Sequence, residues 1–244
     1  MATVNSDTTD GQHSSGFDAS WDNVHDKVNG QGNPTISNAC WGFGVRAVFV
    51  TGRSLFFTTR SFFDFNTSGI SGTVSSATLK IKSNTNVGPG LRVLKSGHDP
   101  SDTSTSWYST WLTGLGGTLS GWSNSDPEVV DYSGQVTTTG TGYGHHSFAL
   151  NPDARSDLFS LAGTSDLFKV VLMDYPYDYL DSAPSGASEL GIYFANYSGD
   201  TRTPVLTLTF AAVGYGNDVI GVDSGDISTI NGIATANISK VNGV

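Results

Sequence analysis

The sequence predicts an all-β fold, an antiparallel and jelly-roll-like β-sandwich that ends in a short repeat-containing arm. Short runs in which apolar and polar residues alternate recur along the chain and are separated by turn residues, as is typical of β-sandwiches. Glycine accounts for 30 of the 244 residues and only 14% of residues are charged, a composition that suits strands and turns better than helical bundles. Helical patterns do not alternate with the strands, which argues against a parallel α/β fold.

The clearest strands are expected at residues 77–82 and 205–210. In both segments, small or aliphatic residues alternate with threonine or lysine, so one face of the strand is apolar and the other is polar. We therefore expect the apolar faces of both strands to lie in the core. The residues predicted to be buried there are Leu79, Ile81, Leu206 and Leu208.

Seven further strands and two short helices complete the predicted sandwich. The strands are expected at residues 43–50, 54–66, 91–94, 129–132, 147–150, 167–173 and 190–194. One helix is expected to follow Ser20, whose side chain can cap its N-terminus. The other is expected to follow Asn151 and to begin with Pro152, residues favoured at the start of a helix, and Gly163 is expected to end it.

A change of composition after Phe210 divides the chain into a sandwich domain, residues 1–212, and a C-terminal arm, residues 213–244. The arm has an eleven-residue repeat, in which residues 227–233 align with residues 238–244, and each copy contains the turn-forming pair Asn-Gly. So short a segment cannot bury its aliphatic side chains alone, and we expect them to dock on a partner. The expected assembly contacts are Ile227, Ile230, Ile233, Ile238, Val241 and Val244.

Charge and cysteine content restrict the expected partners and compartment. The net charge is -10 with only 12 lysines and arginines, so neither nucleic acid nor an anionic membrane is expected as a partner. The N-terminal residues lack the basic and apolar segments of a secretion signal, and Cys40 has no second cysteine to pair with. A virus particle, assembled in the host cytoplasm and exposed outside the cell, reconciles these features with the β-rich composition.

One acidic segment, residues 174–181, is a candidate glycan contact because it contains three tyrosines and three aspartates. Tyrosine rings can stack on sugar rings, and carboxylates can bind hydroxyl groups or Ca²⁺. The alternative is a solvated acidic loop whose tyrosines pack locally or at a subunit interface. The candidate glycan-contact residues are Tyr175, Tyr177, Asp178 and Tyr179.

No catalytic residue, cofactor or metal site is expected from the motifs. His145 and His146 are adjacent, so in a strand they point to opposite faces and make poor joint metal ligands. The chain has no nucleophile-elbow or phosphate-binding motif. A glycosidase would need two carboxylates flanking a cleft, which the sequence alone does not reveal.

Two resemblances sharpen the functional expectation. The stretch Thr59-Arg60-Ser61-Phe62-Phe63-Asp64-Phe65-Asn66, the following Ser76-Ala77-Thr78-Leu79 and the closing Pro204-Val205-Leu206-Thr207-Leu208 resemble DNRLRE-type β-sandwich modules. That resemblance implies a structural, glycan-associated module without an active site. The ending, with Ile238-Ser239-Lys240-Val241-Asn242-Gly243-Val244, is similar to repeats at the ends of structural proteins of tailed bacteriophages.

Together these features predict a non-enzymatic bacteriophage virion structural protein, such as a capsid decoration, fibre or tail-associated subunit. Its expected partners are other virion proteins and further copies of itself, with a host-surface glycan as a candidate receptor. A carbohydrate-binding adhesin on a virion or cell surface is the alternative from another class, and a glycoside hydrolase is a third. Binding that depends on the tyrosines would favour the adhesin, and turnover of a polysaccharide would favour the hydrolase.

Overall fold

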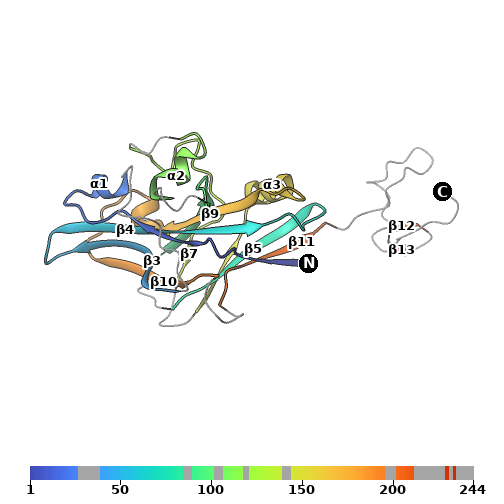
Figure 1. Ribbon diagram of the computed structural model, residues 1–244, viewed down its shortest axis with the longest axis horizontal. Helices are drawn as coiled ribbons and strands as arrows, with labels where there is room; N and C mark the ends of the chain where they lie inside the picture. The colour runs from blue at the N-terminus through green and yellow to red at the C-terminus, as the bar shows by residue number, and fades with distance from the viewer. Residues whose placement is uncertain are drawn as a thin grey trace.

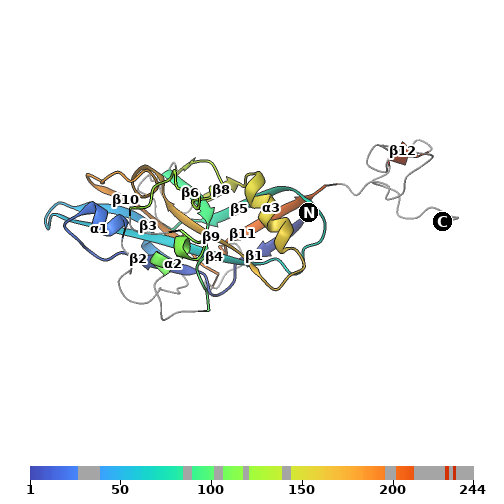
Figure 2. The same cartoon turned by 90° about the horizontal axis from the view of Figure 1, so that it is seen from above.

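The computed structural model describes residues 1–26, 39–84, 90–101, 107–117, 121–138, 144–195, 202–211, 229–230 and 233–234. Two antiparallel β-sheets form the body of the molecule, and three α-helices lie along one side of it (Figure 1). Viewed from that side, α1, α2 and α3 follow one another along the long axis (Figure 2). The predicted all-β, antiparallel sandwich is confirmed.

The first sheet has four strands in the order β1-β11-β5-β8. Their bounds are Ala2–Asn5 for β1, Val205–Phe210 for β11, Val74–Lys82 for β5 and His145–Ala149 for β8. Leu206 lies opposite Leu79 in the pairing of β11 with β5, so the two apolar faces predicted from the sequence share one side of the sheet. Leu79, Ile81, Leu206 and Leu208 are all buried, as predicted.

The second sheet has seven strands, in the order β10-β3-β4-β9-β6-β7, with β2 also paired to β4. Their bounds are Gly11–Ser14 for β2, Ala39–Val50 for β3, Leu55–Asn66 for β4, Gly90–Lys95 for β6, Val136–Thr137 for β7, Leu167–Asp174 for β9 and Ala187–Tyr193 for β10. The long strand β4 organises this sheet, because β3 pairs with its first half and β9 with its second half. The N-terminal segment pairs along β4 as well, through β2 and through bridges at Phe56 and Phe65.

The space between the sheets is filled by aliphatic and aromatic side chains, which we call the inner core. From β4 it receives Phe63 and Phe65, and from α3 it receives Ala154 and Leu158. Most of its other members come from β5, β6, β8, β9, β10 and β11. Burial of this continuous apolar surface is the main force that holds the two sheets together.

Both predicted helices form where the capping residues placed them. In α1, Trp21–His25, the Ser20 side chain accepts a hydrogen bond from the backbone N–H of Asn23. In α3, Pro152–Leu161, Asn151 accepts from the N–H of Ala154 at 3.0 Å. Gly163 follows α3 with φ of 75°, the left-handed conformation that favours glycine after a helix.

One predicted strand was wrong, and several elements were not predicted. Residues 129–132 run beside β6 but make only an isolated bridge, Leu94 to Asp131. The amides of Tyr132 and Ser133 both donate to the carbonyl of Val93, which interrupts a regular ladder. Within the sandwich, the elements that were not predicted are β1, β2, β7, the helix α2, Trp107–Thr113, and the single π-helical turn η1, Tyr175–Tyr179.

In the C-terminal arm, the structure describes one antiparallel strand pair, β12, Thr229–Ile230, with β13, Ile233–Ala234. The two residues between them are Asn231 and Gly232, the turn-forming pair noted in the sequence. The side chains of the six predicted assembly contacts lie outside the described residues, as does that of Cys40. Among the described helices, none has the length and apolarity needed to cross a bilayer.

Candidate functional site

A second cluster lies on the other face of the seven-stranded sheet, beneath α1, α2 and η1. Side chains alternate along β4, so Phe63 and Phe65 enter the inner core while Phe62 packs into a separate cluster on the outer face. Next to it, Arg60 is fully buried. We call the group around Arg60 the outer cluster. Its members are His25, Arg60, Tyr108, Trp111, Trp122 and Asp178.

The centre of the outer cluster is a two-point ion pair between Arg60 and Asp178. The Nε of Arg60 donates to Asp178 at 2.9 Å, and one terminal nitrogen donates at 2.7 Å to the other carboxylate oxygen. Both side chains are completely buried. The guanidinium also lies 4.1 Å from the ring centroid of Tyr108 and 5.3 Å from that of Trp122. This pairing ties η1 to β4 and α2, and it makes Asp178 a structural residue.

His25 closes the cluster from α1. Its ring stacks on Trp122 with centroids 4.4 Å apart, and its Nε2 lies 2.8 Å from the carbonyl oxygen of Asp178. The hydroxyl of Tyr108 donates to the carbonyl of Val24, and burial raises the pKa of that tyrosine well above its usual range. Tyr108 is therefore a neutral hydrogen-bond donor rather than an acid-base group.

The candidate tyrosines on η1 have different surroundings. Tyr175 stacks on Tyr179 with centroids 5.4 Å apart, and the guanidinium of Arg92 lies 4.4 Å from the Tyr179 ring. The Tyr179 hydroxyl donates to Asp131 at 2.9 Å. Burial, with this hydrogen bond, raises the pKa of Tyr179 to about 12. Tyr177 packs instead against the small apolar cluster that contains Trp21.

The four residues predicted to contact a glycan therefore differ in how exposed they are. Asp178 and Tyr179 are buried, and the carboxylate of Asp178 is held by Arg60. Tyr175 and Tyr177 are half-buried, so only these two tyrosines keep appreciable exposed surface. The tyrosines pack locally, as the alternative expected, but the expectation of a solvated acidic loop was wrong, because Asp174 and Asp178 are completely buried.

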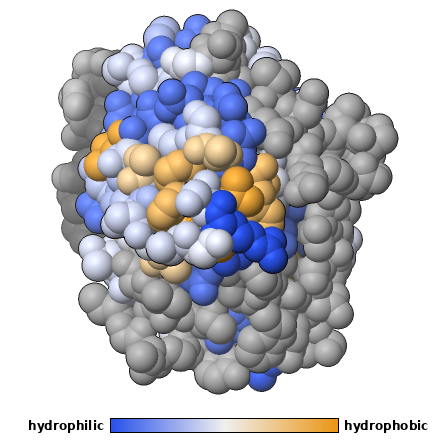
Figure 3. Space-filling view, turned by 90° about the vertical axis from the view of Figure 1, so that its left-hand side faces the viewer, coloured by the Kyte–Doolittle hydropathy of each residue, from blue (hydrophilic) through white to orange (hydrophobic). Residues whose placement is uncertain are grey.

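The end of the molecule that carries α1 and the β3–β4 connection has an apolar surface. Viewed from that end, hydrophobic residues gather among hydrophilic ones (Figure 3). Phe17, which is 47% exposed, packs on Phe57 with centroids 4.8 Å apart, and Phe49 packs on Phe56 at 4.9 Å. We call this surface the aromatic end. It comprises Phe17, Phe49, Val50, Leu55, Phe56 and Phe57.

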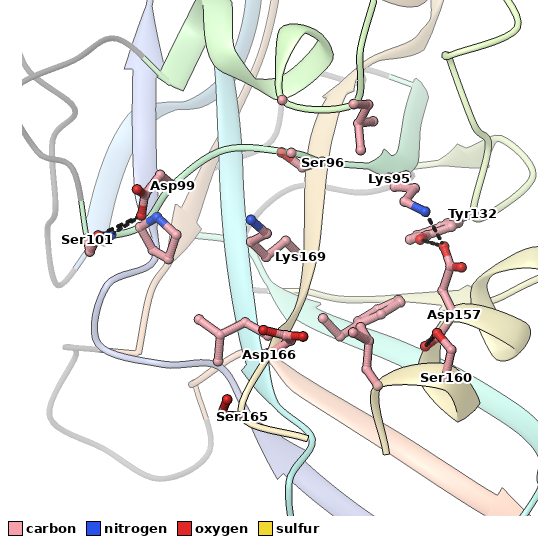
Figure 4. A pocket seen from close by; sticks show the side chains of 17 residues that line it. Lys95, Ser96, Asp99, Ser101, Tyr132, Asp157, Ser160, Ser165, Asp166 and Lys169 are labelled. Atoms are coloured by element: carbon pink, nitrogen blue, oxygen red, sulfur yellow. Dashed lines mark hydrogen bonds and ion pairs between the residues drawn. The ribbon is translucent and has the colours of Figure 1, made fainter. Parts of the chain in front are cut away.

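A cavity of about 520 Å³ lies beside α3, between the end of β6 and the start of β9 (Figure 4). On one wall, Lys95 pairs with Asp157 at 2.8 Å, and the hydroxyl of Tyr132 donates to the same carboxylate. On another, the Nζ of Lys169 donates to the carbonyl of His98 at 2.7 Å. The remaining lining residues are Ser96, Gly97, Asp99, Pro100, Ser101, Gly114, Leu115, Ser160, Leu161, Ser165, Asp166, Leu167 and Phe168.

A serine, a histidine and an aspartate meet at the edge of this cavity. The hydroxyl of Ser96 lies 2.7 Å from Nδ1 of His98, and Nε2 of His98 lies 2.8 Å from a carboxylate oxygen of Asp64. This group was not predicted from the sequence, because Asp64 is more than thirty residues from the other two. The pattern Ser-x-His was the one signal that could have drawn attention to it.

The surroundings of Ser96 fit a turn better than a catalytic nucleophile. Its hydroxyl also accepts the backbone N–H of His98, and the contact between His98 and Asp64 is close without being aligned as a hydrogen bond. An acyl-transfer site needs hydrogen-bond donors aimed at the developing oxyanion, often backbone N–H groups. The nearby amides of Ser96 and Gly97 instead donate to the carbonyls of Lys169 and Trp111.

The remaining candidate groups point to structural roles. His146 lies 3.1 Å from the hydroxyl of Ser83, and burial lowers the pKa of both His145 and His146. Within the described ranges, no group of three or more histidine, cysteine, aspartate or glutamate side chains is placed to hold a metal ion. Trp111 and Trp122 are buried, so their rings contribute to packing.

Comparison with known proteins adds no family assignment. The chain matches no model of a known protein family and no curated protein.

Proposed function

We propose that the protein is a non-enzymatic structural protein of a bacteriophage particle, in which the C-terminal arm docks on the particle and the sandwich is displayed. Capsid decoration, fibre and tail-associated subunits all fit this role. Its expected partners are other virion proteins and further copies of the same chain. Two features support the proposal. The last strand of the sandwich ends at the opposite end of the molecule from the aromatic end, and residues 213–244 contain the repeat.

The observation that carries the proposal is the position of the last sandwich strand. β11 pairs with β1 on one side and β5 on the other, so it is held inside a sheet rather than at its edge. It ends at Phe210, at the end of the long axis opposite the β3–β4 connection (Figure 1). The last described strand of the sandwich thus ends on the side of the molecule away from the aromatic end, as a display role requires.

The arrangement of chemical groups supports a role without catalysis. Arg60 and Asp178 of the outer cluster pair with each other, and in the part of the chain that the structure describes the amides of Ser96 and Gly97 donate to carbonyl groups rather than toward an oxyanion. Docking through the arm would gain free energy from burial of its repeated aliphatic side chains. Many copies on one particle would strengthen individually weak contacts through avidity.

The test compares the full-length protein with a truncated protein that ends at residue 212. Both are tagged and produced in cells infected by the virus, and the tag is quantified in purified particles by immunoblotting. We expect the truncated protein to be folded, with the circular dichroism spectrum of a β-protein, and to be absent from particles. Equal incorporation of the two proteins would overturn the proposal.

A further inference from the structure

We propose that the cavity beside α3 binds one neutral sugar unit of a glycan. This inference goes beyond display of the sandwich and does not depend on how the protein is attached to a particle. It also differs from the glycan contact predicted on η1, because none of those four residues lines the cavity. Three features of the cavity carry the inference, namely its size, its mixture of lining groups and the engagement of its charges.

The volume suits a small ligand. The cavity measures about 520 Å³, within the range of roughly 300–1,000 Å³ that is usual for small-molecule sites. Its walls come from four separate elements, since Lys95 ends β6, Leu115 follows α2, Asp157 lies on α3 and Lys169 lies on β9 (Figure 4). Such a site is formed by the tertiary structure rather than by one loop.

The lining combines hydrogen-bonding groups with aliphatic surface. Hydroxyl groups come from Ser101, Ser160 and Ser165, which are exposed. Partly exposed apolar surface comes from Leu115 and Leu167. A sugar ring presents hydroxyl groups around its rim and C–H groups on its faces, so it needs both kinds of partner. A purely apolar ligand would separate the exposed serine hydroxyl groups from water without replacing the hydrogen bonds that they make to it, which is costly.

The charges of the cavity favour an uncharged ligand. Two lysines line it, but Lys95 is paired with Asp157 and Lys169 donates to the carbonyl of His98. The charge of Lys95 is therefore already balanced by Asp157, and a phosphate or carboxylate bound beside Lys95 would lie close to that carboxylate. Two further aspartates, Asp99 and Asp166, line the same cavity, so an anionic ligand would also be repelled by their negative charges. These contacts favour a neutral, polyhydroxylated molecule over an anion.

The polar groups are already fixed before a ligand arrives. Asp157 accepts from Tyr132 as well as pairing with Lys95, and the Tyr132 ring stacks on Phe168 with centroids 5.3 Å apart. Ser160 donates its hydroxyl to the carbonyl of Asp157 within α3. Groups held in this way lose little conformational entropy when they bind, which favours recognition of a small, weakly binding ligand.

The test measures binding of four neutral sugars to the full-length protein: glucose, galactose, mannose and N-acetylglucosamine. Glucuronate and glucosamine serve as the anionic and cationic comparisons. Saturation-transfer NMR detects binding, and calorimetry gives the affinity.

Ser165→Trp places a bulky ring at an exposed lining position and should block the cavity. Ser156→Trp is the matched control, because Ser156 is exposed on α3 but does not line the cavity.

We expect at least one neutral sugar to bind the wild-type and Ser156→Trp proteins with equal affinity. Ser165→Trp should weaken that binding at least about tenfold, the equivalent of about 1.4 kcal/mol. The inference is overturned if no neutral sugar binds, if only a charged sugar binds, or if Ser165→Trp binds as well as the control. Incorporation of Ser165→Trp into particles should be normal, so failure here is distinguishable from failure of the display proposal.

Discussion

The two faces of the seven-stranded sheet are packed by different means. The inner core consists of aliphatic and aromatic side chains whose burial needs no specific partner. On the outer face, a buried arginine is enclosed by three aromatic rings and held by one aspartate. The stability that the inner face contributes depends on the buried apolar area and on how well the side chains fit together. The stability that the outer face contributes depends on whether every buried polar group has a partner.

This difference separates what a sequence reveals from what it conceals. Alternation along a strand records which face is apolar, so the burial of Leu79 and Leu206 could be read directly from neighbouring residues. The outer cluster joins Arg60 on β4 with Tyr108 on α2 and Asp178 on η1. No local pattern encodes contacts among segments so far apart in the chain.

The largest expected effect follows from removing the partner of the buried arginine. Asp178→Asn leaves the guanidinium of Arg60 buried without its counter-ion, because both side chains are fully buried in the native protein. We expect the free energy of unfolding to fall by about 3–5 kcal/mol. Urea denaturation followed by tryptophan fluorescence measures this change. A loss below about 1 kcal/mol would show that water reaches Arg60.

In the inner core, we expect a loss of unfolding free energy of similar size that varies with the volume of side chain removed. Leu79→Ala removes a completely buried side chain opposite Leu206 and should lower the free energy of unfolding by about 2–5 kcal/mol. Leu79→Met conserves most of the volume and should cost less than about 1.5 kcal/mol. If the two variants were equally unstable, the inner core would depend on a specific shape rather than on buried area.

The fold was largely predictable from sequence, and the sites were not. The capping residues Ser20 and Asn151 identified two helices because their interactions are local. The helix α2 was missed because its tryptophans and tyrosine are more typical of strands than of helices, and its buried aromatic residues pack around Arg60. The cavity could not be predicted because its lining comes from segments spread over residues 95–169, brought together only by the tertiary structure.

Acidity should stabilise the protein through two buried carboxyl groups. Burial raises the pKa of Asp10 and of Asp174 from 3.8 to about 7. Between pH 3.8 and about pH 7, these two carboxyl groups hold protons in the folded protein but release them in the unfolded chain, so the free energy of unfolding falls as pH rises. We expect the free energy of unfolding to be at least about 1 kcal/mol greater at pH 5 than at pH 8.

The variant Asp174→Asn tests the source of this pH dependence, because an amide cannot ionise. Asp174 accepts hydrogen bonds from the N–H of Tyr177 and the hydroxyl of Ser188, and asparagine retains an acceptor for the first. The difference in unfolding free energy between pH 5 and pH 8 should shrink in the variant. An unchanged difference would assign the effect to other groups.

The smallest effect is expected at an ion pair that water reaches. Arg46 and Glu189 pair at 3.0 Å across β3 and β10, and their side chains are 19% and 25% exposed. Glu189→Gln should change the free energy of unfolding by less than about 1 kcal/mol. Urea denaturation of this variant beside Asp178→Asn compares an accessible pair with a buried one. Equal losses would contradict the distinction between them.

The display proposal is tested most directly by two matched pairs of substitutions in the repeat of the arm. Ile227→Asp with Ile238→Asp places charges at two aligned aliphatic positions, and Ser228→Asp with Ser239→Asp places the same charges at the neighbouring aligned serines. Each tagged protein is quantified in purified particles. We predict that the isoleucine variant is folded but absent from particles, while the serine variant is incorporated normally. Equal incorporation of both would contradict docking through the aliphatic residues of the arm.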